Sequence, residues 1–540
     1  MNNNKIIIYQ IFTRLYGNRC TARVPNGSIE QNGCGKLNGF TPKVLKQIRE
    51  MGVSHVWYTG IIRHATTTDY TRYGLPRQHP AVVKGRAGSP YAIVDYYDVD
   101  PDLAEDVDQR MQEFERLVSR THRAGLKVVI DFVPNHVARQ YHSVARPQGV
   151  RDLGEDDNPE VGFDPERNNF YYCPGQTFTP YFDLYHGETE PYTETPAKAT
   201  GNDCFHNAPG RNDWYETVKL NYGVDYYAGH VGHFLPTPDT WTKMLHILLF
   251  WAQKGVDAFR CDMAEMVPAE FWAWATARVR EAYPEVRFIG EVYNPAEYRR
   301  YIASGFDYLY DKVGMYDAMR DVICHRRTSE AITQAWQQTD DIRDHMLYFL
   351  ENHDEQRLAS DFFAGSGEKG VPGLVVSALM QKGPFMLYFG QEWGERGMDA
   401  EGFSGRDGRT TIFDYWSLQP ADTPLTEVYR KVLNIARTER CVREGQMFDV
   451  MYANRQYARQ YAFLRKAGKD VMLVVANFDD LPLTMTICIP DHAFDYLEMQ
   501  ERAYCAEDLL SGEERSLVLI KGTPVEVALE ARGAVVYKLR

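Results

Sequence analysis

The sequence has no long hydrophobic run and no cluster of basic residues. Near the N-terminus, MNNNKIIIYQIF has one short apolar segment interrupted by Tyr9 and Gln10, which is too short for a signal-peptide core or a membrane span. The formal net charge of −14 disfavours binding to nucleic acid phosphates or to an anionic membrane surface. We therefore expect neither nucleic acid nor membrane as a partner, and the sequence leaves the oligomeric state open.

Paired cysteine motifs and low-complexity stretches are also missing. The nine cysteines are scattered, odd in number and without a C-x-x-C pair, which favours reduced thiols over a disulfide framework. This pattern predicts a folded cytoplasmic protein. Aromatic residues, by contrast, make up 13% of the chain, with 35 Tyr and 9 Trp. Such rings either stack on sugars or fill cores, and composition alone does not separate the two.

Short apolar runs alternate with helical patterns along the first 440 residues. One helix has its apolar face between Val107 and Val118 and is closed by Gly125, and another is expected over Thr240–Lys254, with Asp239 as N-cap. Continuous apolar strands between helices indicate a parallel sheet covered on both faces. Eight runs predict an α/β fold with a closed (β/α)8 TIM barrel. The predicted strands are Ile6–Ile11, Val53–Tyr58, Leu126–Val133, Val256–Arg260, Val286–Ile289, Phe306–Leu309, Met346–Leu350 and Phe385–Phe389.

The spacing of the strands breaks once. Asp262 lies 131 residues after Asp131 (262 − 131), whereas one βα unit of such a barrel takes roughly 30. A long irregular segment rich in Tyr, Gly, Pro and Asn therefore projects after the third strand, beside the expected active site. After the barrel the pattern becomes alternating and β-rich. The predicted domains are 1–136 (barrel domain A, first part), 137–232 (inserted domain B), 233–442 (domain A, second part) and 443–540 (C-terminal antiparallel β-sandwich domain C).

Carboxylates recur at the predicted carboxyl ends of the strands. Asp262, Glu291 and Asp354 are separated by 29 and 63 residues (291 − 262 and 354 − 291), close to one and two βα units. They should therefore meet at one mouth, where they suggest either a metal site or glycosidic bond chemistry. The segments lack the H-x-x-x-H spacing typical of a metal site. A retaining glycosidase instead needs two carboxyl groups about 5 Å apart.

Four segments carry a family resemblance: DFVPNH, GVDAFRCD, FIGEVY and FLENHD. In order and spacing they resemble the four conserved segments of the α-amylase family of retaining glycoside hydrolases, glycoside hydrolase family 13. IYQIFTRLYGN, GVSHVWYTGI and GPFMLYFGQEWGE are similar to the first, second and eighth strands of that family. The resemblance spans nearly the whole chain and implies the inserted domain and the C-terminal β-domain.

The resemblance implies a role for each site residue. Asp262 would be the nucleophile and Glu291 the general acid/base, while Asp354 would hold sugar hydroxyls of the distorted ring. Four residues would bind the substrate or hold the site: Arg260 would keep Asp262 ionised and oriented, His136 and His353 would bind hydroxyls, and Tyr91 would stack on the sugar. Taken singly, a histidine is more often a core residue with satisfied hydrogen bonds than a substrate contact. Tyr91 taken alone would be a core residue as often as a substrate contact.

Two lysines stand where many members of the family hold calcium. Lys219 occupies the position of an aspartate, Met266 that of a histidine whose carbonyl binds the ion, and Lys36 replaces an aspartate in the first-strand loop. Asn135 matches the family pattern. Calcium prefers charged oxygen ligands, so we predict no metal and no cofactor, with the Lys219 ammonium in place of the ion.

The second departure follows the nucleophile, where MAEM replaces a common A-V-K-H pattern. Glu265 and Met266 cannot reproduce the contacts that Lys and His make with the leaving-group sugar, which leaves hydrolysis and transfer both open. We predict a retaining hydrolase of α-1,4-glucosidic bonds in starch, glycogen or maltooligosaccharides. The alternatives are a 4-α-glucanotransferase or maltosyltransferase on the same scaffold, or a non-catalytic carbohydrate-binding member.

Overall fold

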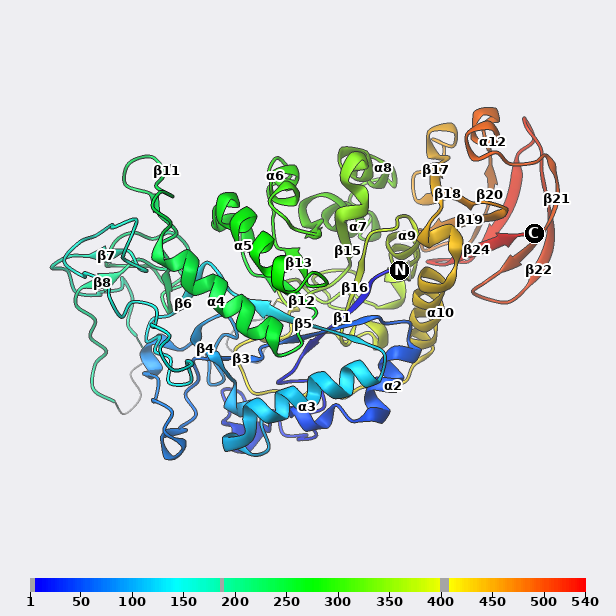
Figure 1. Ribbon diagram of the computed structural model, residues 1–540. Coiled ribbons are helices and arrows are strands. Elements are labelled where there is room, and N and C mark those ends of the chain that lie inside the picture. Colours follow the sequence, from blue (N-terminus) through cyan, green and yellow to red (C-terminus); the bar gives the residue numbers. More distant parts are fainter. Residues whose placement is uncertain (1–4, 185–188, 399–406) are drawn as a thin grey trace.

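A closed barrel of eight parallel strands forms the centre of the computed structural model, which describes residues 5–184, 189–398 and 407–540 (Figure 1). All eight strands coincide with predicted apolar runs, so the predicted (β/α)8 barrel is confirmed. In chain order they are β1 (Ile7–Phe12), β2 (His55–Thr59), β5 (Lys127–Phe132), β12 (Ala258–Cys261), β13 (Arg287–Gly290), β14 (Tyr308–Tyr310), β15 (Met346–Phe349) and β16 (Phe385–Tyr388).

The barrel interior is filled by side chains rather than left as a pore. Alternate residues of a strand point to opposite faces, so each strand sends some side chains inward and the others toward the helices. The inward set forms its own buried apolar cluster, which supports the strand ends above it. It includes Ile8, Trp57, Val129, Ala258, Ile289, Tyr310, Leu347, Phe349 and Met386.

Helices surround the barrel and follow its strands. Two of them end where the sequence predicts, because Gly125 and Gly255 adopt φ values of 75° and 89° that favour glycine. The predicted N-cap at Asp239 is wrong: the helix begins at Asp239 with Pro238 in the cap position, and the Asp239 side chain is used elsewhere. The main helices are α2 (Pro42–Glu50), α3 (Arg110–Arg123), α4 (Asp239–Gln253), α5 (Ala269–Ala282), α6 (Tyr298–Ala303), α7 (Asp317–Ile323), α8 (Glu330–Gln338), α9 (Val371–Leu379) and α10 (Pro424–Thr438).

The segment between β5 and α4 projects from one side of the barrel, at the left of Figure 1. Its described residues form short antiparallel pairs and no helix. The pairs are β6 (His136–Ala138) with β9 (Thr217–Lys219), β7 (Tyr172–Cys173) with β8 (Ala197–Lys198), and β10 (Val224–Asp225) with β11 (Val231–Gly232).

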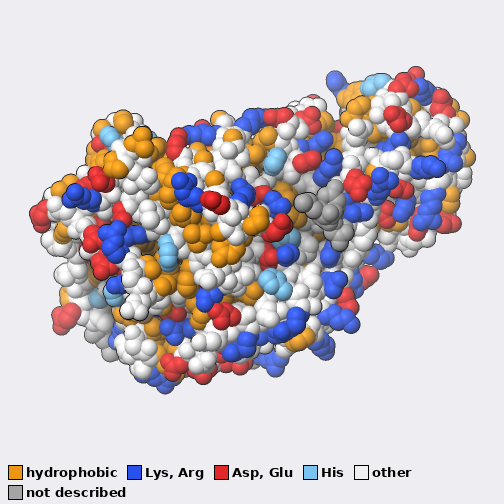
Figure 2. All heavy atoms as spheres, viewed as in Figure 1, with side chains coloured by type: hydrophobic (Ala, Val, Ile, Leu, Met, Phe, Trp, Pro, Cys, Tyr) orange, Lys and Arg blue, Asp and Glu red, His pale blue; other side chains and the backbone are white. Residues whose placement is uncertain are grey.

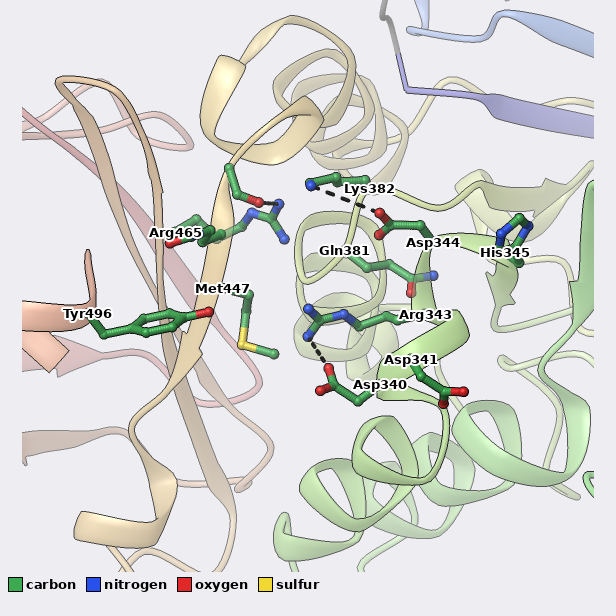
Figure 3. Close-up of a pocket in the computed structure, with 12 residues that line it drawn as sticks. Asp340, Asp341, Arg343, Asp344, His345, Gln381, Lys382, Met447, Arg465 and Tyr496 are labelled. Carbon is green, nitrogen blue, oxygen red and sulfur yellow. Dashed lines mark hydrogen bonds and ion pairs between the residues drawn. The ribbon is translucent and has the colours of Figure 1, made fainter. Parts of the chain in front are cut away.

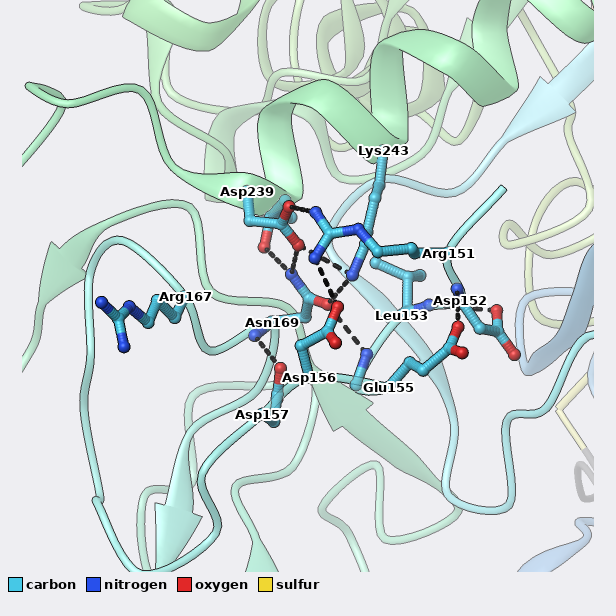
Figure 4. Close-up of polar contacts among 12 residues, drawn as sticks. Arg151, Asp152, Leu153, Glu155, Asp156, Asp157, Arg167, Asn169, Asp239 and Lys243 are labelled. Carbon is cyan, nitrogen blue, oxygen red and sulfur yellow. Dashed lines mark hydrogen bonds and ion pairs between the residues drawn. The ribbon is translucent and has the colours of Figure 1, made fainter. Parts of the chain in front are cut away.

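A polar network centred on the buried Lys243 anchors this insertion to the start of α4 (Figure 4). Lys243 Nζ lies 2.7 Å from an Asp239 carboxylate oxygen and 2.8 Å from Asn169 Oδ1. Arg151 donates to the other Asp239 oxygen at 2.6 Å and also pairs with Asp156. Because Lys243 is almost fully buried, its charge depends on these partners. The Asp239 carboxylate therefore ties the insertion to the barrel instead of capping the helix.

The last hundred residues form an antiparallel β unit, at the right of Figure 1. A six-stranded sheet comprises β17 (Gln446–Asp449), β18 (Gln460–Ala467), β19 (Asp470–Asn477), β24 (Ala534–Leu539), β21 (Arg502–Asp508) and β22 (Glu514–Leu519), in that order. β20 (Leu483–Ile487) and β23 (Val525–Leu529) form a second, two-stranded sheet. The predicted C-terminal β-domain is thus present.

A polar cavity of about 270 Å³ lies between the barrel and this β unit (Figure 3). It is lined by Arg343 and Asp344, which precede β15, and by Lys382, Met447 and Tyr496. Since parallel strands place active sites at their carboxyl ends, this cavity lies at the opposite end of the barrel from the expected mouth.

Acidic and basic side chains are interspersed over the face shown in Figure 2. In the described part of the chain, every helix is too short or too polar to cross a membrane.

Candidate active site

The carboxyl ends of neighbouring barrel strands deliver the predicted site residues. Arg260 lies within β12, where it pairs in register with Asp131 of β5, and Asp262 follows directly. Glu291 follows β13, and Asp354 comes soon after β15. Because all these strands run parallel, their ends meet on one rim.

Arg260 bridges the two carboxylates expected to perform the chemistry. Its Nη1 lies 2.8 Å from Asp262 Oδ1, and its Nη2 lies 2.8 Å from Glu291 Oε2. Nη1 also lies 3.4 Å from Asp131 Oδ1. One planar guanidinium therefore holds the two carboxyl groups beside each other, with the fixed fork geometry that arginine provides.

Aromatic rings surround this fully buried guanidinium. Trp57, Tyr91 and Tyr310 have ring centroids 5.2 to 5.5 Å from the Arg260 Cζ atom. Trp57 Nε1 also donates to Asp131 at 2.9 Å. The rings and the bond from Trp57 fix the guanidinium and Asp131, so Asp131 acts as part of the support under the site.

His353 links Asp354 to the rest of the network. Its Nε2 lies 3.2 Å from Asp354 Oδ2 and 2.5 Å from the Tyr91 hydroxyl, and its Nδ1 lies 2.8 Å from Gln10 Nε2. The Tyr91 ring stacks on the imidazole at 5.2 Å. Burial, followed by the charge of Arg260, lowers the pKa of His353 well below its usual value, so the ring stays neutral.

His136 lies buried at the start of β6. Its ring packs against Trp214 at 5.2 Å, and it is hydrogen-bonded to the backbone of Tyr91. Burial lowers the pKa of His136 to about 3, and the nearby Lys219 ammonium adds to this. The neutral imidazole therefore belongs to the same connected group as Tyr91. The structure thus gathers all seven predicted residues, while their individual roles stay predictions.

Burial dominates the titration of the carboxyl cluster. It raises the pKa of Asp262 well above the usual value; Arg260 opposes this rise, and Glu291 and Asp354 add to it. Burial also raises the pKa of Asp354 and brings that of Asp131 to about 6. Because several carboxyl groups share one guanidinium, Arg260 alone does not offset burial and mutual repulsion at Asp262, contrary to the expectation that Arg260 keeps this carboxyl group ionised.

The segment after Asp262 contacts the strand end that carries Glu291, which the sequence did not suggest. Met263 has a left-handed backbone (φ 43°), and its N–H donates to Glu291 Oε2 at 2.8 Å. Non-glycine residues adopt this conformation at a cost that surrounding structure must offset. The Tyr293 hydroxyl donates to Glu291 Oε1 at 2.6 Å. Sequence analysis missed Tyr293, Tyr310 and Gln10, since such residues in or beside a strand are usually core.

Lys219 lies among the groups that the resemblance assigns to calcium. Its Nζ lies 2.6 Å from Asp203 Oδ1, donates to Asn135 Oδ1, and lies 3.4 Å from the Met266 carbonyl oxygen. An ammonium group occupies the centre of this oxygen set, so the residues present do not fit a divalent cation.

The ammonium of Lys36 likewise lies among oxygen acceptors, since it donates to the carbonyls of Asp102 and Ala104 at 2.6 and 3.0 Å. Among the described residues, no group of three or more His, Cys, Asp or Glu side chains is arranged to hold a metal ion.

A (β/α)8 barrel whose mouth holds two carboxylates bridged by one arginine has the architecture of a glycosidase. The family model "Alpha amylase, catalytic domain" matches residues 10–426. The chain therefore belongs to the α-amylase family of glycosidases.

Several relatives are similar over most of this chain. Alpha-amylase 3 of Dictyoglomus thermophilum is 23% identical over 72% of the chain and 64% of its own length. Neopullulanase 2 of Thermoactinomyces vulgaris is 21% identical over 90% of the chain and 71% of its own length. The chain thus spans about two thirds of the length of these two relatives. The crystal structure of a maltogenic α-amylase from Thermotoga neapolitana superposes with a TM-score of 0.66 at 21% identity, covering 100% of this chain and 99% of that one.

Proposed function

We propose that the protein hydrolyses α-1,4-glucosidic bonds in starch, glycogen or maltooligosaccharides with retention of anomeric configuration. Asp262 attacks the anomeric carbon while Glu291 protonates the glycosidic oxygen, which releases the leaving sugar and forms a covalent glycosyl-enzyme. Water then attacks that carbon; Glu291 accepts its proton, and Asp262 leaves as a carboxylate. Asp354, His353 and His136 bind hydroxyls of the distorted ring, and Tyr91 stacks on it.

One observation carries this proposal: the Arg260 guanidinium lies 2.8 Å from both Asp262 and Glu291. A shared guanidinium keeps the two carboxyl groups beside each other, which supports one of them acting as nucleophile and the other as acid. The relatives support the substrate class, since neopullulanase and cyclomaltodextrinase are among them.

The decisive experiment incubates the protein with maltoheptaose and measures both new reducing ends and product lengths. Hydrolysis gives shorter products with one new reducing end for each bond cleaved. Glu291→Gln should lower the rate by about 10² to 10⁴. Full activity in this variant would overturn the mechanism, and no activity in the native protein would favour a non-catalytic carbohydrate-binding role.

A transferase is the second candidate. Many family members have a Lys and a His after the nucleophile that contact the leaving-group sugar. Glu265 does not replace these contacts, because its carboxylate accepts hydrogen bonds from the backbone N–H groups of Tyr293 and Asn294. Acceptor binding in this protein therefore differs from the common family pattern. Products longer than maltoheptaose without new reducing ends would identify a 4-α-glucanotransferase or maltosyltransferase.

We also propose that the protein works without calcium and in the cytoplasm. The Lys219 ammonium supplies the positive charge between barrel and insertion. All nine cysteines are free thiols, which suits a reducing compartment. Cell fractionation tests the location, and recovery of activity in an oxidising extracellular fraction alone would contradict it.

A further inference from the structure

The segment from Met263 to Met266 reaches across to the loop that carries Glu291. Met263 N–H donates to Glu291 Oε2 at 2.8 Å. Two residues on, the Glu265 carboxylate accepts the backbone N–H groups of Tyr293 and Asn294 at 3.1 and 3.0 Å. The strand end of the nucleophile thus fixes the strand end of the acid/base at two places.

Tyr293 completes this arrangement from the other side. Its hydroxyl donates to Glu291 Oε1 at 2.6 Å. Burial, and then the charges of Glu291 and Asp354, raise the pKa of Tyr293 well above its usual value. The hydroxyl therefore keeps its own proton and remains a donor in the working pH range.

The two oxygens of Glu291 are not equivalent. Oε2 accepts the Met263 N–H and lies 2.8 Å from Arg260 Nη2, so a hydrogen-bond donor and a positive charge both favour leaving this oxygen unprotonated. These contacts favour Oε1 as the oxygen that carries the proton Glu291 delivers. This is the oxygen that Tyr293 contacts, so the Tyr293 hydroxyl controls how Oε1 points toward the substrate.

We propose that Tyr293, held in place by Glu265, is a positioning residue that orients Glu291 for proton transfer through Oε1. The proposal rests on the proposed function, in which Glu291 is the acid/base. In the first step the proton passes from Oε1 to the glycosidic oxygen as Asp262 bonds to the anomeric carbon. In the second step a water proton returns to Oε1, and Tyr293 gains or loses no proton in either step.

Leaving-group dependence tests this role. Maltoheptaose needs protonation of its leaving oxygen, whereas fluoride leaves α-maltosyl fluoride with far less help. For both substrates kcat/KM reports the steps up to formation of the glycosyl-enzyme. Tyr293→Phe should lower kcat/KM for maltoheptaose about tenfold to a hundredfold. Its kcat/KM for α-maltosyl fluoride should stay within about threefold of the native value. Tyr283→Phe, a partly buried tyrosine outside the site, is the matched control and should change neither.

Glu265 supplies a second, independent variant. Glu265→Gln keeps an oxygen that can accept the two backbone N–H groups and should stay close to the native selectivity between the two substrates. Glu265→Ala removes the acceptor and should reproduce the loss seen in Tyr293→Phe. Adding Tyr293→Phe to Glu265→Ala should cost little more, because both changes act on one interaction.

Three results would overturn the proposal: equal losses on both substrates in Tyr293→Phe, no loss on either, or full activity in Glu265→Ala. Equal losses would mean that Tyr293 serves only the local fold. Failure of the proposed function is distinguishable, because the native protein would then act on neither substrate, and the role of Tyr293 would fall with it.

Discussion

At the scale of single residues, one lysine links the barrel, the insertion and the segment after Asp262. Lys219 comes from β9; its partner Asn135 follows β5, Asp203 lies within the insertion, and Met266 follows β12. Burial lowers the pKa of Lys219, and the charge of Asp203 opposes this. An internal cation therefore joins parts that lie far apart in the sequence.

Chelators should leave the stability of the native protein unchanged, because Lys219 supplies the charge. We expect the same melting temperature with and without EDTA. Lys219→Met should lower the free energy of unfolding by about 3 kcal/mol, since it leaves buried oxygen acceptors without their cation. The exposed Lys469→Met is the control and should have little effect. A melting temperature that drops several degrees in EDTA would contradict the assignment.

Asp311 offers a pH-dependent prediction. Burial raises its pKa to about 6, although the Met315 N–H donates to it at 3.0 Å. An unfolded aspartate has a pKa of about 3.9, so between about pH 4 and 6 the folded state holds a proton that the unfolded state has lost. The stability contributed by this group is therefore full below that window and falls as pH rises through it.

Asp311→Asn has no proton to lose at this position. Relative to the native protein, it should gain about 2 kcal/mol in free energy of unfolding between pH 4 and pH 8. Urea unfolding at the two pH values measures the difference, with the exposed Asp361→Asn as control. If the difference between Asp311→Asn and native protein is the same at both pH values, the interpretation is wrong.

The sequence predicted the charged residues of the site better than the aromatic and polar residues that hold them in place. Arg260 and Asp262 could be placed together because they are two residues apart on one strand. The same two-residue spacing relates Glu291 to Tyr293 and could have identified it. Trp57 and Gln10 gave no such signal, because a strand residue that faces a barrel interior looks the same whether it fills space or holds a catalytic group.

At the scale of elements, the helix α4 does more than cover the barrel. Its first turn holds the insertion through Asp239 and Lys243 (Figure 4). The sequence predicted the strands and the ends of α3 and α4, because apolar runs and glycines act locally. It misassigned Asp239 because the partners of that carboxylate, Arg151 and Asn169, lie about 70 to 90 residues away and cannot be found from local patterns.

Breaking this anchor should loosen the insertion. Lys243→Met leaves the Asp239 carboxylate without its buried cation and should lower the free energy of unfolding by about 3 kcal/mol. Amide hydrogen exchange should become faster over residues 151–169 and stay unchanged in β18 and β19. Lys254→Met, just after the same helix, removes only a part-exposed pair with Glu115 and should cost less than about 0.5 kcal/mol. Equal effects of the two variants would argue against the anchor.

At the scale of the whole molecule, Arg465 joins the C-terminal β unit to the barrel. This buried guanidinium donates to the carbonyls of Cys441, Val442 and Gly445 at 2.7, 3.0 and 2.7 Å and also to that of Met380, which follows α9. One side chain therefore satisfies carbonyl groups of both parts, so the two parts should unfold together.

Calorimetry should show a single cooperative transition for the native protein. Arg465→Met leaves four carbonyls without a charged donor and should lower the free energy of unfolding by at least about 3 kcal/mol. We expect the transition to broaden or split as the two parts uncouple. Two separate transitions in the native protein would show that Arg465 does not couple them.

The internal ammonium of Lys219 affects how the protein obtains this charge and how it can be handled. A bound ion is acquired from the surroundings and is lost by dilution, by phosphate or by a competing ligand. An ammonium on a side chain is instead made together with the polypeptide, in fixed ratio to it. We therefore expect purification and storage in ion-free buffer to leave this cation in place, and only deprotonation, acylation or replacement of the lysine to remove it.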